Sequence, residues 1–214
     1  MRTKALILAA AVSAMGVASS MAQVYSVNAV GYINVTVPAG KLAMIANQLN
    51  SANMTIGSLL ANAPDGATVY QYLPNGTFNI ATYLGFLGAW DPVDTIPLAP
   101  GGGLFAFNPD ASPWTITFVG EVPQGNTSNP IPNGLAIRSS IVPQGGGLTS
   151  VLGYPAEDGD TCYQYVPATG AYTINTYLGF LGAWDPAEPT PAVGESFYIQ
   201  SGTARNWTRT FSVN

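Results

Sequence analysis

The chain has 214 residues, of which only 8% are charged, whereas an ordinary globular domain has about 25%. Its net charge is −5, and this negative balance excludes the basic surface that nucleic-acid binding requires. The sequence contains no histidine and one cysteine, Cys162. Ser-His-Asp and Cys-His active sites, histidine-based metal sites and an internal disulfide are therefore excluded as well.

The chain begins with the pattern of a secretory signal peptide. Two basic residues precede an apolar run from Ala5 to Val17, and Ser20-Met21-Ala22 supplies the small residues of a cleavage site. We therefore expect residues 1–22 to be removed and the mature chain, which begins at Gln23, to be secreted or displayed at the cell surface. The apolar run is too short to span a bilayer and no later segment is apolar enough, so we expect no transmembrane segment.

Beyond residue 23, short segments rich in β-forming residues alternate with turns. Four of these segments are Tyr32–Val37, Thr68–Leu73, Thr115–Val122 and Thr161–Val166. Hairpin turns are expected at Pro74-Asn75-Gly76 and Ala168-Thr169-Gly170, because glycine and asparagine tolerate the positive φ of a tight turn. Helix is limited to single turns at Thr55–Ala61 and Gly147–Leu152, which makes the predicted fold class all-β.

The mature chain is also duplicated. The eleven residues Thr82–Pro92 recur without a change as Thr176–Pro186, and the likeness continues on both sides of them. An internal repeat of this kind indicates two copies of one structural unit. We predict two tandem β-sandwich or barrel-like repeats, residues 23–118 and 119–214, or one sheet system, with internal pseudo-twofold symmetry and little helix.

The eleven repeated residues contain the candidate ligand-binding residues. They read Thr-Tyr-Leu-Gly-Phe-Leu-Gly-Ala-Trp-Asp-Pro, so three large aromatic side chains are separated by glycines that let the backbone bend. One interpretation is an aromatic plug that covers the open end of each β unit. The other is an exposed platform on which a sugar ring or a partner's side chain stacks. The residues of that platform are Tyr83, Phe86 and Trp90 in the first copy and Tyr177, Phe180 and Trp184 in the second.

Two further features favour structural roles. Cys162 stands where the first copy has Val69, which is typical of a half-buried strand position and not of a reactive thiol. Glu157, Asp158 and Asp160 form an acidic loop with the oxygen ligands that calcium prefers. The first copy has a single acid at this place, so a solvated loop is favoured over a metal site.

The remaining carboxylates do not indicate catalysis. A glycosidase pair can be assembled from Asp91, Asp185 and the acidic loop, but both aspartates recur by duplication in a turn. The composition also supplies few groups for acid–base chemistry. We expect no catalytic residue, no metal, no cofactor and no enzyme activity.

The repeat boundary predicts how the chain ends are arranged. Thr117–Val122 reads as one continuous strand that finishes the first unit and starts the second, and Tyr25–Gly31 and Thr210–Asn214 resemble the two halves of it. The termini are therefore expected to pair within one molecule as a clasp. Alternatively, the end of one chain pairs with the start of the next and builds a filament, which a surface with few charges does little to block.

Three segments carry a resemblance to a group of proteins: Val24–Tyr32, Phe118–Gly125 and Trp207–Asn214. Together they resemble a group of exported, internally duplicated β proteins of Verrucomicrobia-type bacteria, and the likeness covers essentially the whole mature chain. The resemblance implies an exported bacterial protein and transfers no catalytic residue.

The sequence thus predicts a non-enzymatic, secreted structural or surface-attachment protein of the cell envelope or extracellular matrix. Its expected partners are other copies of itself or a cell-surface polymer. The alternative is a carbohydrate-binding module that binds a polysaccharide through the duplicated aromatic motif. A glycosidase is the third and least favoured hypothesis.

Overall fold

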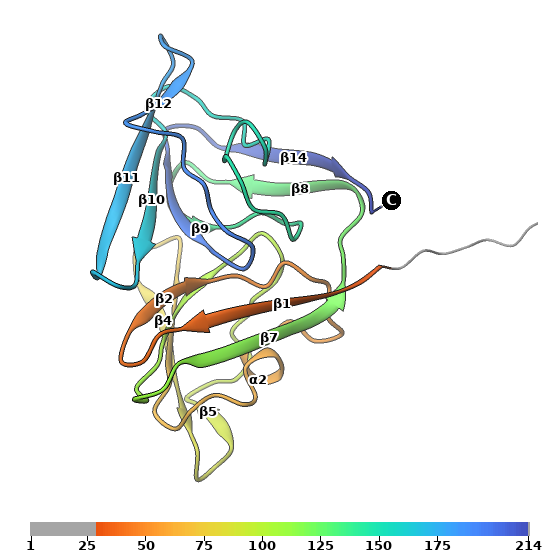
Figure 1. The fold of residues 1–214 in the computed structure, drawn as a ribbon, viewed down its shortest axis with the longest axis vertical. Coiled ribbons are helices and arrows are strands. Elements are labelled where there is room, and N and C mark those ends of the chain that lie inside the picture. The colour runs from red at the N-terminus through yellow and green to blue at the C-terminus, as the bar shows by residue number, and fades with distance from the viewer. Residues whose placement is uncertain (1–28, 214) are drawn as a thin grey trace, which may run out of the picture.

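The computed structural model describes residues 29–213 (Figure 1). The predicted signal peptide lies outside the described residues. Within them the chain forms four β-sheets and one short helix, α2 (Ile56–Leu59). The all-β class with little helix is confirmed, and no helix of residues 29–213 is long and apolar enough to cross a membrane.

The first half contains a two-stranded and a five-stranded sheet. In the small sheet, β1 (Val30–Val37) runs antiparallel to β7 (Trp114–Glu121). The large sheet has the order β2-β6-β3-β4-β5. Its strands are β2 (Leu42–Ile45), β3 (Thr68–Tyr72), β4 (Phe78–Leu84), β5 (Ala89–Asp91) and β6 (Leu104–Phe107).

The second half has the same strand order. Its small sheet pairs β8 (Gly125–Ile131) with β14 (Arg205–Phe211), again antiparallel. Its large sheet has the order β9-β13-β10-β11-β12, in which each strand takes the place of its counterpart in the first half. These strands are β9 (Gly134–Arg138), β10 (Thr161–Val166), β11 (Ala171–Leu178), β12 (Ala183–Asp185) and β13 (Phe197–Ser201).

The small and the large sheet of each half share one hydrophobic cluster. On β7, strand alternation turns Trp114, Ile116 and Phe118 inward and leaves the threonines between them exposed, as the sequence predicts. In the second half, Trp207 of β14 lies in one cluster with Phe197 of β13. Each half therefore has its own core, and the expected boundary between residues 118 and 119 falls inside β7.

A third hydrophobic cluster joins the two halves, where the large sheets pack against each other. Tyr72 of β3 meets Tyr198 of β13 with ring centroids 5.4 Å apart, and Phe105 of β6 meets Tyr165 of β10 at 5.4 Å. The two contacts are equivalent. In the first, β3 of the first half meets β13 of the second, and in the other, the counterpart of β3, β10, meets β6, the counterpart of β13. Each large sheet has its own core on one face, and the other half covers part of the opposite face, along β2, β3 and β6 or β9, β10 and β13.

Backbone hydrogen bonds between the halves are reciprocal in the same way. The N–H of Ala46 donates to the carbonyl of Gly194 at 2.8 Å, and the N–H of Ser139 donates to the carbonyl of Gly101 at 3.1 Å. In the first bond, the donor follows the edge strand β2 and the acceptor lies in the loop before β13. In the second bond, the donor follows the edge strand β9 and the acceptor lies in the loop before β6. The two halves therefore hold each other through equivalent segments.

Most local expectations agree with the structure. The predicted hairpin turns join β3 to β4 and β10 to β11, with Gly76 at a φ of +82° and Gly170 at +70°. α2 lies within Thr55–Ala61, but Gly147–Leu152 forms turns instead of a helix.

The expected clasp between the termini is wrong for the described residues. β7 continues to Glu121, as a continuous strand across the boundary requires, but its partner is β1, and the partner of β14 is β8. The first and last strands thus pair within their own halves, although both described ends lie on the same side of the molecule (Figure 1). Residues 25–28 and 214 lie outside the described residues.

Cys162 lies on β10, in the core of the second half, and is fully buried. Its place on a strand is as expected, and its burial is complete where the sequence predicted a half-buried position. This burial raises the pKa of the thiol far above its ordinary value. The thiol is therefore protonated and unreactive at neutral pH.

We expect a soluble thiol reagent to leave the native protein unlabelled at about pH 8, because Cys162 is inaccessible and protonated. The same reagent should label one thiol per chain after denaturation in guanidinium. The absorbance of the released reagent, followed with and without denaturant, measures both. Fast labelling of the native protein would show that the second core is open to solvent.

Candidate functional site

The eleven repeated residues form the same β-hairpin in each half. Thr82–Pro92 covers the end of β4, a turn and β5, and Thr176–Pro186 covers the end of β11, a turn and β12. In each hairpin the tyrosine lies opposite the tryptophan, and the Asp-Pro peptide bond at the end is cis. The two turns lie at opposite ends of the long axis, the first at the bottom of Figure 1 and the second at the top.

Trp90 and Trp184 attach the hairpins to the two cores, since these side chains are only 5% and 8% exposed. Tyr83 packs edge-on against Trp90 with ring centroids 5.5 Å apart, and Tyr177 meets Trp184 at 5.4 Å. Aromatic pairs of this geometry add about 0.5–1.5 kcal/mol to the burial of the rings. Both tryptophans and both tyrosines of the six candidate residues therefore pack on the cores, as the plug interpretation predicts.

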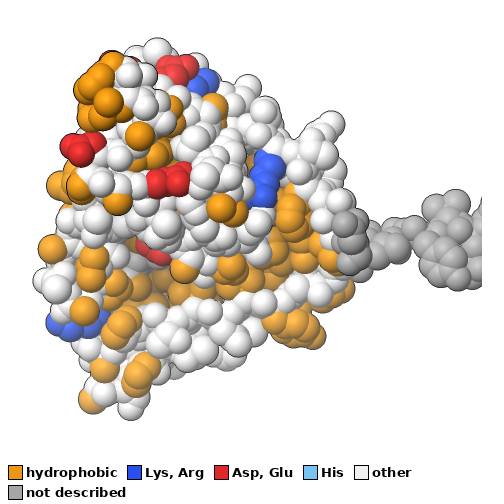
Figure 2. Space-filling view, turned by 45° about the horizontal axis from the view of Figure 1, so that its top comes forward, with side chains coloured by type: hydrophobic (Ala, Val, Ile, Leu, Met, Phe, Trp, Pro, Cys, Tyr) orange, Lys and Arg blue, Asp and Glu red, His pale blue; other side chains and the backbone are white. Residues whose placement is uncertain are grey.

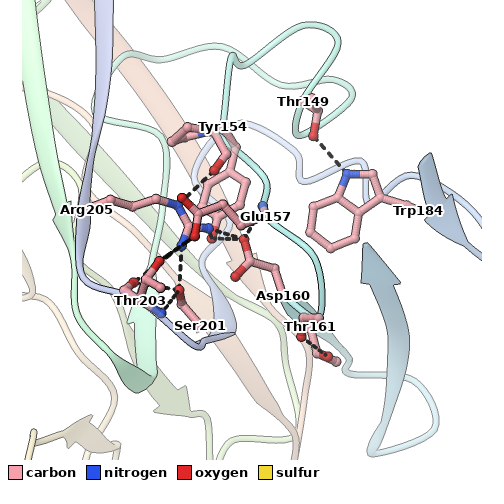
Figure 3. A network of polar contacts seen from close by, with 11 residues as sticks. Thr149, Tyr154, Glu157, Asp160, Thr161, Trp184, Ser201, Thr203 and Arg205 are labelled. Carbon is pink, nitrogen blue, oxygen red and sulfur yellow. Dashed lines mark hydrogen bonds and ion pairs between the residues drawn. The ribbon is translucent and has the colours of Figure 1, made fainter. Parts of the chain in front are cut away.

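The two tryptophans differ in one hydrogen bond. The Nε1 of Trp184 donates to Oγ1 of Thr149 at 2.8 Å (Figure 3), whereas the Nε1 of Trp90 is buried without a partner among residues 29–213. A buried donor without a partner costs about 1–3 kcal/mol. The second hairpin is therefore the better satisfied of the two.

An aspartate outside the motif braces each turn. Oδ1 of Asp65 accepts the N–H of Gly85 at 2.6 Å, and Oδ1 of Asp158 accepts the N–H of Gly179 at 2.7 Å. A Cβ added to these glycines would lie 3.1 Å and 2.8 Å from the Cβ of the respective aspartate. The first glycine of the motif is thus required by the close approach of the aspartate.

Other positions of the motif have structural roles as well. The second glycine, Gly88 or Gly182, has a φ of +64° or +63°, where a residue with a Cβ is strained. The hydroxyl group of the first threonine in each copy lies 3.1 Å from that of a threonine on the neighbouring strand. Packing and backbone geometry therefore account for the threonine, the tyrosine, both glycines and the tryptophan.

The phenylalanine and the leucine between the two glycines have no such role. Phe86 and Leu87 are 83% and 60% exposed at the tip of the first hairpin, and Phe180 and Leu181 are 82% and 61% exposed at the tip of the second. None of the four belongs to a hydrophobic cluster of the described residues. Figure 2 shows hydrophobic side chains at the upper and lower ends of a surface with few charges. We define these two pairs as the hairpin tips.

The six candidate aromatic residues do not meet in one site. Their tryptophans and tyrosines belong to two separate cores, and their phenylalanines project at opposite ends of the molecule. Leu87 and Leu181 were not among the residues expected from the sequence. The glycines on either side of each Phe-Leu pair are the available signal, because glycine favours a tight turn.

The acidic loop of the second half is engaged by the protein itself (Figure 3). Asp160 is buried in an ion pair with Arg205 and accepts a hydrogen bond from the hydroxyl of Tyr154 at 3.1 Å. Glu157 accepts a hydrogen bond from the hydroxyl of Thr203. Glu157 also lies 3.4 Å from Arg205, so it shares this partner with Asp160. The third carboxylate of the loop, Asp158, braces the hairpin turn. Residues 29–213 contain no group of three possible metal ligands.

A shallow cleft of about 250 Å³ lies beside β12. Its lining includes Tyr177, Trp184 and Glu188. Burial of the Glu188 carboxylate opposes its ionisation, but hydrogen bonds from the N–H groups of Ser150 (2.7 Å) and Thr149 (2.6 Å) outweigh this, and its pKa is lowered. The cleft therefore combines two candidate aromatic residues with a carboxylate that is ionised at neutral pH.

We expect alanine substitution to separate the anchoring residues from the exposed ones. Trp90→Ala or Trp184→Ala removes a buried ring and should lower the free energy of unfolding by about 3–5 kcal/mol. Phe86→Ala or Phe180→Ala should change it by no more than about 0.5 kcal/mol, because the ring is already in water. Denaturant unfolding of the four variants measures these differences. A loss below about 1 kcal/mol in both tryptophan variants would contradict the anchoring role.

Comparison with known proteins adds no family to this description. No protein-family model matches the chain, and neither a curated protein nor a solved structure matches it significantly. What the protein does is therefore inferred from the two hairpins and their exposed tips.

Proposed function

We propose that the chain is a non-enzymatic, exported structural protein that attaches to a surface of the cell envelope or extracellular matrix through its two hairpin tips. One observation carries this proposal: Phe86 and Phe180 are exposed in a motif whose tryptophans, tyrosines and glycines serve the fold. Neighbouring apolar side chains that are grouped at a protruding turn form an exposed apolar patch, and such patches can serve as binding contacts.

The two tips belong to what we infer to be two tandem, sandwich-like units, residues 23–118 and 119–214, related by a pseudo-twofold axis. The shared strand order and the reciprocal contacts between the large sheets support this arrangement. Hydrophobic clusters between a small and a large sheet support a sandwich within each unit. Each unit contributes one tip, so the molecule has two attachment points.

A non-enzymatic role is supported by the placement of the carboxylates. Asp91 and Asp185 lie on β5 and β12, in hairpins at opposite ends of the molecule (Figure 1). A glycosidase needs its two carboxyl groups about 5–10 Å apart on either side of one bond. These two aspartates therefore do not suit one active site.

Export is proposed from the signal-peptide pattern of residues 1–22. If the protein is made in a bacterial host that processes such signals, we expect the released chain to begin at Gln23. N-terminal sequencing of the protein collected outside the cytoplasm checks this position. A chain that keeps Met1 and remains in the cytoplasm would contradict export.

The carbohydrate-binding alternative is favoured by one observation, the cleft beside β12. Tyr177 and Trp184 line it together with Glu188, and sugar-binding sites commonly combine an aromatic face with a polar acceptor. The hydrogen bonds from Ser150 and Thr149 already occupy the Glu188 carboxylate. The tips therefore remain the better candidate.

Attachment can be tested with isolated cell envelopes of the producing bacterium. We expect the exported protein to sediment with the envelopes and the Phe86→Asp/Phe180→Asp double variant to stay in the supernatant. A charged carboxylate at the tip makes its transfer out of water unfavourable. Addition of soluble polysaccharides tests the alternative, because competition by a sugar polymer would favour the cleft.

Tyr32→Asp serves as the matched control, because Tyr32 is an exposed aromatic residue on β1, away from both hairpins. This variant should sediment as the wild type does. All variants should show the same unfolding transition, since none of the three side chains is buried. Sedimentation of the double variant at the wild-type level would rule out the tips as the attachment points.

A further inference from the structure

The side chains of the hairpin tips are apolar and uncharged, and the nearest carboxylate, that of Asp65 or Asp158, lies beside the first glycine of each turn. Each hairpin segment, Thr82–Pro92 or Thr176–Pro186, contains no lysine or arginine and a single aspartate, which stands next to the proline at its end. Between the two glycines only phenylalanine and leucine are present. The tips therefore offer neither a cation for an anionic partner nor side-chain hydrogen bonds for a polar one.

In each turn, three of the four N–H groups from the first to the second glycine are hydrogen-bonded within residues 29–213, all but that of the phenylalanine. In the first hairpin, the N–H groups of Leu87 and Gly88 donate to the carbonyl of Leu84 at 3.0 Å and 2.9 Å, and Asp65 accepts the N–H of Gly85. In the second hairpin, the equivalent bonds to Leu178 are also 3.0 Å and 2.9 Å. Donors satisfied in this way can leave water at little cost, which favours insertion of the tip into a membrane interface.

The apolar surface area of one tip distinguishes between two kinds of partner, another protein and a lipid bilayer. One phenylalanine and one leucine supply on the order of 300 Å² of surface, well below the roughly 800 Å² per partner of a stable protein interface. A second copy of the chain docked on a tip alone would thus be held weakly. Insertion into a lipid bilayer requires no complementary surface, because the hydrocarbon adapts to the inserted side chains.

We propose that each tip inserts its Phe-Leu pair into the interface of a neutral lipid bilayer, and that one molecule joins two bilayers. This inference rests on the proposed function, in which the tips are the attachment points. Because the tips lie at opposite ends of the long axis, they do not reach the same flat membrane (Figure 1). Each insertion is weak and reversible, as it is for a short lipid anchor, and several molecules acting together hold two membranes in contact.

The test uses phosphatidylcholine vesicles and the exported protein. Co-sedimentation measures binding, and turbidity measures clustering of vesicles. We expect the wild type to bind and cluster them, and the single variants Phe86→Asp and Phe180→Asp to bind but no longer cluster them. In the double variant, the vesicle-bound fraction should fall by about tenfold or more, as loss of a large buried apolar side chain implies. Tyr32→Asp should behave as the wild type.

Three outcomes would overturn the inference. If the wild type is retained by envelopes but not by vesicles, the tips attach to something other than lipid and only the proposed function stands. If a single variant clusters vesicles as the wild type does, bridging does not use both ends. If light scattering shows that the tips drive association of the protein without lipid, a second copy is their partner.

Discussion

Each hairpin depends on a tryptophan that faces the core while the turn beside it faces water. Trp90 and Trp184 lie on strands of three residues, which form too few ladder hydrogen bonds to hold a hairpin by themselves. Burial of the ring supplies the missing stabilisation, and the hydrogen bond that Asp65 or Asp158 accepts from the turn fixes the direction of the turn. An apolar tip is therefore held out into solvent, where hydrophobic collapse alone would have drawn it onto the surface.

The packing of the two large sheets sets the distance between these tips. Each sheet places one face in its own core and part of the other face against the opposite half, where Tyr72 and Tyr198 meet. Tyrosine suits this second face, because its ring packs in the contact while its hydroxyl group can reach water at the rim. The hairpins extend from these sheets in opposite directions (Figure 1), so one molecule has one tip at each end. The proposed joining of two surfaces rests on this arrangement.

Local properties of the chain are sufficient for the fold class and for part of the candidate site. Alternation on β7 and turn residues at Gly76 and Gly170 describe neighbours along one strand or turn, so they predict strands and hairpins correctly. The exchange of Val69 for Cys162 also predicts a strand position, but not its complete burial. The identity of the two eleven-residue segments likewise indicates one structure built twice. These features depend on the backbone preferences of single residues and on the two-residue alternation of side chains along a strand. Both can be read from neighbouring residues in the sequence.

Tertiary structure alone decided which aromatic residues are buried and where the tips lie. Gly85 and Gly88 interrupt the alternation of the motif, so no period assigns Trp90 to the core and Phe86 to solvent; the packing of β5 does. The acids in the loop before β10 also have partners that are distant in sequence. The buried ion pair of Asp160, for example, is formed with Arg205. The pairing of the terminal strands and the opposite placement of the tips follow from contacts between segments far apart in the chain. By itself the sequence determined an all-β chain with one eleven-residue segment repeated, and long-range packing made the two copies into hairpins with exposed tips at opposite ends.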